Sequence, residues 1–180
     1  MKIVDQFDAA KYGTYKEFLQ LYAGDPNAVP IVPSVNLLGV AILGRQDENE
    51  RKHIIMRLLS DGGNPNYVTR KNEDALILLF KRGAREWSSE GISWLVKALI
   101  SAGLDISRRD AWGNDALMLS VRNTKQESYE LLPSWKILLD AGADPTIAGP
   151  QDKTTLDWAN EFSWRKDFLA LSSKCGFVKE

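Results

Sequence analysis

The chain has little material for a catalytic or metal centre. Its 180 residues include one histidine, His53, and one cysteine, Cys175. A histidine-based metal site or catalytic triad therefore has very little to build with. A lone cysteine forms no intramolecular disulfide, which is typical of a reducing compartment. We expect His53 to be structural or solvated, Cys175 to be a packed thiol, and the protein to have no metal, no cofactor and no enzymatic activity.

A strong charge of one sign and long apolar runs are missing too. The 23 Lys and Arg against 24 Asp and Glu leave a net charge of −1, so no overall field attracts nucleic acid or an anionic membrane. No window approaches the roughly 18 apolar residues of a membrane-spanning helix. Asp5 and Asp8 interrupt the N-terminus, where a signal peptide would be apolar. We expect a cytoplasmic protein that binds neither nucleic acid nor a membrane.

What the sequence does contain is a repeat. A turn with glycine followed by Asp or Asn recurs four times, at Ala23–Pro26, Gly62–Pro65, Gly103–Ile106 and Gly142–Pro145. A leucine stands 12 residues after each Asp or Asn; these leucines are Leu37, Leu76, Leu117 and Leu156. A fixed internal period predicts stacked units, which present rows of side chains on one extended face.

Each unit has the signals of an inner helix, an outer helix and an extended segment, which we call a finger. In the fourth unit an Asn-Asp start precedes the apolar run Ala116–Val121, and a second helix, Trp135–Ala141, ends at Gly142. Glycine there suits a left-handed helix terminus. The other predicted helices are Phe7–Gly13, Tyr15–Tyr22, Leu37–Ala41, Ile54–Leu59, Ala75–Phe80, Trp94–Ile100, Leu156–Ala159 and Phe168–Leu171.

The units resemble the ankyrin repeat, in which two helices are followed by Gly-Ala-Asp and a β-hairpin finger. The closest stretch is Asp105–Leu117, which has the family's finger spacing. The family's Leu-Leu pair has counterparts at Leu58-Leu59, Leu99-Ile100 and Leu138-Leu139. The resemblance implies an all-α, ankyrin-type α-solenoid of about five helix-pair repeats with β-hairpin-like fingers. It forms a single domain over residues 1–180, with repeats at approximately 1–33, 34–72, 73–113, 114–152 and 153–180.

The chain departs from the family pattern in two ways. No unit has the Thr-Pro-Leu-His tetrapeptide that opens the first helix of an ankyrin repeat. The spacings between successive leucines, 39, 41 and 39 residues, exceed the roughly 33 of the family. Because the finger spacing is constant, the extra residues must lie between the two helices, at Arg45–His53, Arg85–Ile92 and Asn123–Pro133. We expect helices extended by about a turn there, joined by lengthened inter-helix loops.

Trp112 is the residue that most favours a binding surface. It stands at a finger tip, where a side chain has little packing to do, close to Arg108 and Arg109. Exposed tryptophan and arginine are typical of interface hot spots. The alternative, equally open, is that Trp112 folds back onto a neighbouring finger. The candidate partner-binding residues are Trp112, Arg108, Arg109, Ala111, Tyr67, Arg70, Lys71, Lys81 and Arg122.

The remaining tryptophans divide into two groups. Trp94, Trp135 and Trp158 fit apolar positions of predicted helices, so we expect them in the core. Trp87 and Trp164 stay open between a core role and a contact surface, and Trp87 lies in one of the insertions.

These features together predict a non-catalytic protein–protein interaction module, whose partner is another protein and not a small molecule. Divergent ankyrin arrays of this size resemble bacterial immunity proteins that neutralise a toxin made by the same cell. That resemblance implies a stoichiometric inhibitor that binds and blocks a bacterial toxin or effector. The alternative is an adaptor or scaffold that holds a client protein without inhibiting it.

Overall fold

A computed structural model describes residues 2–30 and 35–177, and within them the chain is all-α, with ten α-helices and no strand. The helices are α1 (Gln6–Tyr12), α2 (Tyr15–Leu21), α3 (Leu37–Ile42), α4 (Glu48–Ser60), α5 (Ala75–Leu78), α6 (Ser89–Ser101), α7 (Ala116–Asn123), α8 (Ser128–Asp140), α9 (Thr155–Glu161) and α10 (Lys166–Lys174). A π-helical turn, Leu79–Gly83, continues α5. The predicted boundary between the first two units, at residues 33 and 34, lies outside the described residues.

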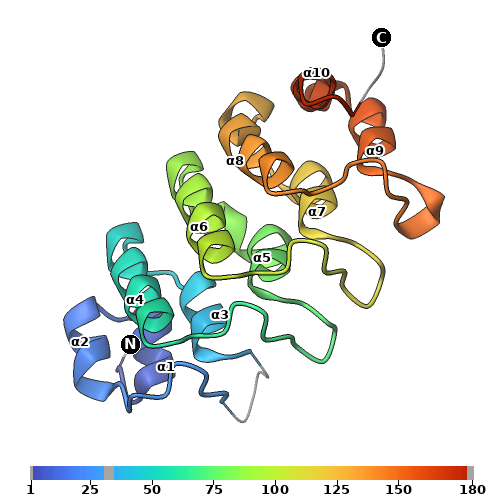
Figure 1. Cartoon of the computed structure of the whole chain (residues 1–180). Coiled ribbons are helices and arrows are strands. Elements are labelled where there is room, and N and C mark those ends of the chain that lie inside the picture. The colour runs from blue at the N-terminus through green and yellow to red at the C-terminus, as the bar shows by residue number, and fades with distance from the viewer. Residues whose placement is uncertain (1, 31–34, 178–180) are drawn as a thin grey trace.

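The helices follow one another in pairs along the molecule (Figure 1). The inner helices α1, α3, α5, α7 and α9 form one row, in which each packs on the next. The outer helices lie beside them, with α2 against α4, α6 against α8 and α8 against α10. The segments after α4, α6 and α8 run out to one side of the two rows.

The recurring glycines end the long outer helices. Gly62, Gly103 and Gly142 have φ of 89°, 85° and 98°, the left-handed region that glycine enters without strain. The residue after each glycine donates its amide to the carbonyl five positions earlier, at 2.8–3.1 Å, which closes a Schellman motif. The predicted helix stops are therefore confirmed, and the chain leaves each outer helix in the same direction.

The expectation that the extra residues lengthen the helices is confirmed for the outer helices. Much of each insertion forms their first turns, so that α4, α6 and α8 each contain 13 residues. These helices begin early because Asp47 and Ser88 cap α4 and α6, and Glu127 and Glu130 form a capping box on α8. The rest of each insertion lies in the connections 43–47, 79–88 and 124–127, the second of which contains the π-helical turn and a 3-10 helix, Ala84–Glu86.

Paired strands are also missing from the fingers in the described part of the chain. The backbone there forms one isolated antiparallel bridge, between Arg109 and Asp115. A backbone hydrogen bond closes each of three fingers, from the amides of Thr69, Asp110 and Gly149 to the carbonyls four residues further on, and side chains add to it, as the next section describes. The finger expected as a β-hairpin is therefore a compact turn without paired strands.

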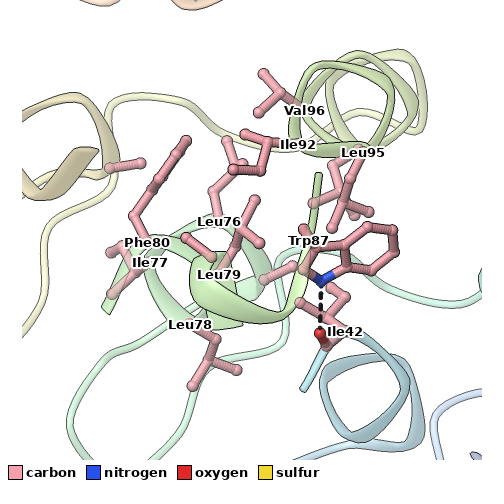
Figure 2. Close-up of a cluster of buried hydrophobic side chains, with 14 of the residues drawn as sticks. Ile42, Leu76, Ile77, Leu78, Leu79, Phe80, Trp87, Ile92, Leu95 and Val96 are labelled. Carbon is pink, nitrogen blue, oxygen red and sulfur yellow. Dashed lines mark hydrogen bonds between the residues drawn. The ribbon is translucent and has the colours of Figure 1, made fainter. Parts of the chain in front are cut away.

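Trp87, which the sequence left open between the core and a contact surface, belongs to the core. Its indole is buried among the side chains of α5 and α6 and donates a hydrogen bond of 3.0 Å to the carbonyl of Ile42 (Figure 2). The Arg51 guanidinium from α4 lies 4.1 Å from the centre of the Trp87 ring, which itself stacks on Trp94. Trp87 thus fills the space between α4 and α6, and a large residue in the insertion serves packing.

Arg165 is almost fully buried between the fourth and fifth helix pairs. Its guanidinium donates to the carbonyls of Val121, Gln126 and Thr124 at 2.7–2.9 Å, and to the Thr124 hydroxyl at 3.0 Å. These carbonyls lie at the end of α7 and just after it. The last carbonyls of a helix receive no hydrogen bond from the helix backbone. Arg165 therefore closes the end of α7.

We predict that Arg165→Ala lowers the free energy of unfolding by about 3–5 kcal/mol, because it leaves several buried carbonyls without a donor. The neighbouring Lys166 is exposed, so Lys166→Ala removes the same charge and is the matched control, with an expected change within about 0.5 kcal/mol. Urea unfolding followed by tryptophan fluorescence measures both. Equal, small losses for the two variants would contradict the role given to Arg165.

Candidate functional site

We call residues 64–74, 105–115 and 144–154 the third, fourth and fifth fingers, after the unit whose inner helix each precedes, and from here on we count each finger as part of that unit. The third and fourth close in the same way: one side-chain oxygen accepts from the amides two and four residues further on. Thr69 does so at 3.2 and 3.3 Å, and Asp110 at 2.9 Å for both. Three residues after these acceptors, Asn72 and Gly113 take positive φ of 56° and 84°. The finger tips are therefore ordered turns.

Hydrogen bonds join each finger to the next. The amide of Ala111 donates to the Lys71 carbonyl at 2.9 Å, and the Asn72 side chain donates to the Arg109 carbonyl at 2.5 Å. Arg109 in turn donates from its guanidinium to the carbonyl of Ala148 in the fifth finger, at 2.5 Å. The tips are thus held at fixed positions relative to one another.

Two asparagines make a second set of bridges nearer the helices. Asn27 and Asn66 each reach the next turn, donating to its glycine carbonyl and accepting from the amide two residues beyond that glycine, at 2.7–3.2 Å. Ser107 holds the equivalent place in the fourth turn but bonds Asp105 of its own turn. The asparagine bridges therefore connect the second, third and fourth units, while Arg109 connects the fourth to the fifth.

Trp112 combines the two roles that the sequence left open. Its ring rests on the third unit, with the Lys81 and Lys71 ammonium nitrogens 3.9 and 5.3 Å from the ring centre. Even so, 52% of the residue remains exposed. The two lysines hold the indole by cation–π attraction and leave a large apolar surface open to solvent.

Beneath this ring lies a charged cluster that the sequence analysis missed. Glu73 and Asp110 are 1% and 5% exposed, and Lys81 lies 2.9 Å from a carboxylate oxygen of each. Arg82 adds a second cation at 2.9 Å from Glu73. Burial pushes the pKa of Asp110 up, but the hydrogen bonds from Lys81 and from the finger amides outweigh it and hold that pKa below its ordinary value.

The cluster continues into the fourth unit. The side chain of Asn114 donates its amide hydrogens to the Asp110 carboxylate at 3.1 and 3.2 Å, and its Oδ1 accepts from Arg122 at 2.8 Å. The Arg122 guanidinium lies 4.0 Å from the centre of the Trp158 ring. Lys153, 4.5 Å from the same ring, pairs with Glu161 at 2.5 Å. One chain of polar contacts therefore crosses three units.

These pairs share a spacing of eight residues: three before the recurring leucine and five after it. The pairs are Glu73 with Lys81, Asn114 with Arg122, and Lys153 with Glu161. The order of charges reverses in the last pair. We call the surface that carries Lys81, Arg122, Lys153 and Glu161 the inner face. A search of the sequence for polar or charged pairs at this eight-residue spacing could have identified Glu73.

The structure gives the predicted binding residues three different positions. Arg70, Lys71, Ala111 and Trp112 are exposed and form the tip patch, and Tyr67 is half-buried behind it. Lys81 and Arg122 lie on the inner face in the contacts just described. Arg108 and Arg109 face carboxylates at the helix starts, Asp74 at 3.9 Å and Asp115 at 3.5 Å.

Other expectations concern single side chains. Trp135 and Trp158 are buried, as predicted, and Trp94 is half-buried against the core. Trp164 is 60% exposed, with its ring stacked on Phe162. His53 is exposed and its ring lies 5.6 Å from that of Tyr15. Cys175 is a free thiol, half-buried against the core.

Two absences hold for residues 2–30 and 35–177. They contain no group of three or more His, Cys, Asp or Glu side chains placed to hold a metal ion, and no helix with the length and apolar character needed to cross a membrane. In comparisons with known proteins, no family model matches the chain and no curated protein matches it. The interpretation of the site therefore depends on its own geometry.

Asp74 caps α5, and burial shifts the pKa of its carboxyl group strongly. It is 2% exposed, and its carboxylate accepts from the amide of Ile77 at 2.9 Å. Burial raises its pKa to about 6, against the partial relief from the Ile77 amide and from Arg108. Asp115, the equivalent cap of α7, has a pKa raised by burial as well. In the folded state, burial therefore disfavours the ionised form of both acids.

A raised pKa means that the folded protein binds the proton more tightly than the unfolded chain. Asp74 therefore contributes stability below about pH 4 that is lost as the pH rises towards 6. We predict that Asp74→Asn, which keeps a capping side chain, removes this loss. Relative to the variant, the wild type should lose up to about 3 kcal/mol between pH 4 and pH 7. Urea unfolding of both proteins at the two pH values tests this, and a constant difference would contradict it.

Proposed function

We propose that this chain is an ankyrin-type α-solenoid of five repeats in a single domain, and that it works in the cytoplasm as a non-catalytic protein-binding module. The fold assignment is supported by the constant spacing between turn and leucine, the glycine stops with positive φ, and the row of helix pairs. The tetrapeptide of the family is absent, and Asp74, Asp115 and Thr154 cap the inner helices in its place.

The observation that carries the proposed function is the tip patch around Trp112. A half-exposed indole on a rigid turn, with cations beside it, has the composition of an interface hot spot. Hydrogen bonds between fingers already fix its position, so little conformational entropy remains to be lost on binding. A protein partner fits this patch better than nucleic acid, because much of the positive charge beside it is paired within the chain.

The specific role we favour is that of a stoichiometric inhibitor, such as an immunity protein that binds and blocks a bacterial toxin or effector. Its support is the resemblance of small divergent ankyrin arrays to such proteins. An adaptor or scaffold that binds a client without inhibiting it is the alternative. The partner captured from the native host, assayed with and without one equivalent of this protein, separates the two roles. Loss of partner activity at a one-to-one ratio favours the inhibitor, and full activity favours the adaptor.

We predict that Trp112→Ala weakens partner binding by about 1–3 kcal/mol and leaves the melting temperature nearly unchanged. Tyr129 on the outer helix α8 is 68% exposed, so Tyr129→Ala is a matched loss of an exposed aromatic and should bind as the wild type does. Calorimetric titration of the captured partner measures both affinities. Equal affinity for the Trp112→Ala variant and the wild type would refute the tip patch as the binding surface.

A further inference from the structure

Arg122 differs from the other cations of the inner face in having a neutral partner. Lys81 contacts two carboxylates and Lys153 contacts one. Within residues 2–30 and 35–177, no carboxylate pairs with Arg122, whose guanidinium donates to the side-chain oxygen of Asn114 instead. Asn114 is oriented by the Asp110 carboxylate, which takes its amide hydrogens. One half-buried positive charge therefore remains without an opposite charge.

The surroundings of Arg122 fix the plane of its guanidinium. The group lies 4.0 Å from the centre of the Trp158 ring, and its bond to Asn114 uses one of its five N–H donors. The other donors stay available for a planar acceptor such as a carboxylate, which arginine binds through two parallel hydrogen bonds. Trp158 itself has a buried indole N–H with no hydrogen-bond partner. The polar edge of this ring therefore lacks a hydrogen-bond partner within the chain.

We infer that Arg122, stacked on Trp158, receives an aspartate or glutamate side chain of the partner protein. The inference rests on the proposed function and names the chemistry that the partner must present. The local charge favours a carboxylate over a phosphate: Lys153 and Glu161 cancel, which leaves one positive charge for a singly charged acid. Arg122 also belongs to the chain of contacts that starts under Trp112. In that chain Asp110 and Asn114 stand between Arg122 and Lys81, so one partner protein can span the tip patch and Arg122.

The test is a titration of the ¹⁵N-labelled protein at low salt with an acetylated, amidated tetraglutamate peptide. The readout is the indole N–H signal of Trp158, assigned by its loss in Trp158→Phe. We expect a saturable shift with tetraglutamate and none with tetraglutamine. Inorganic phosphate at the same concentration should produce a clearly smaller shift. An equal shift with phosphate would overturn the assignment to a carboxylate side chain.

Two variants test Arg122, and both are checked for a native backbone spectrum. Arg122→Gln removes the cation, and Arg122→Glu replaces it with a carboxylate that repels the peptide. Each should weaken peptide binding at least tenfold. Arg85, an exposed arginine between α5 and α6, supplies the control Arg85→Gln, with unchanged affinity. Wild-type affinity in either folded variant overturns the inference.

Measurements on the captured partner keep this inference apart from the proposed function. If Trp112→Ala weakens the complex and Arg122→Gln does not, the partner binds the tip patch and the carboxylate inference fails. If Arg122→Gln weakens the complex tenfold and Trp112→Ala has no effect, the tip patch fails and the inner-face position stands. Loss in both variants supports both statements.

Discussion

The sharing of Lys81 between two buried carboxylates is the interaction on which the finger region depends. Glu73 and Asp110 come from different units, and both would be costly to bury without a cation. Because Lys81 lies 2.9 Å from each, it joins the end of the third inner helix to the base of the fourth finger. The same ammonium group lies under the ring of Trp112. The position of the exposed indole thus follows from a buried charge arrangement.

Buried arginines do comparable work at the C-terminal ends of other inner helices. Arg51 donates to the carbonyls of Gly44 and Glu86 and stacks on Trp87, and Arg165 donates to three carbonyls at and beyond the end of α7. A guanidinium suits this position because its planar donors satisfy several acceptors at once. Fingers and helix ends are therefore both fixed by charged groups that contact backbone or side chains of the adjoining unit.

The sequence predicted those features that are set locally and repeated. Glycine stops such as Gly103, caps such as Asp115 and apolar runs such as Ala116–Val121 depend on residues close in the chain, and each is confirmed. The place of Trp87 stayed open because it depends on contacts between units. The Trp87 indole donates to the carbonyl of Ile42, a residue 45 positions away. A pattern of neighbouring residues does not reveal a contact at that separation.

In the candidate site, the sequence likewise does not show which charged side chains are paired within the chain. The sequence gives no reason to treat Lys71 and Lys81 differently. In the structure, however, Lys71 is exposed at a finger tip, whereas Lys81 is paired with two buried carboxylates. Intramolecular pairing therefore decides which predicted binding residues have charge left for a partner. By that criterion the inner face keeps one uncompensated cation, Arg122, because its partner at the eight-residue spacing is an amide. A single Asn in place of an acid changes a structural ion pair into a position open to an external anion.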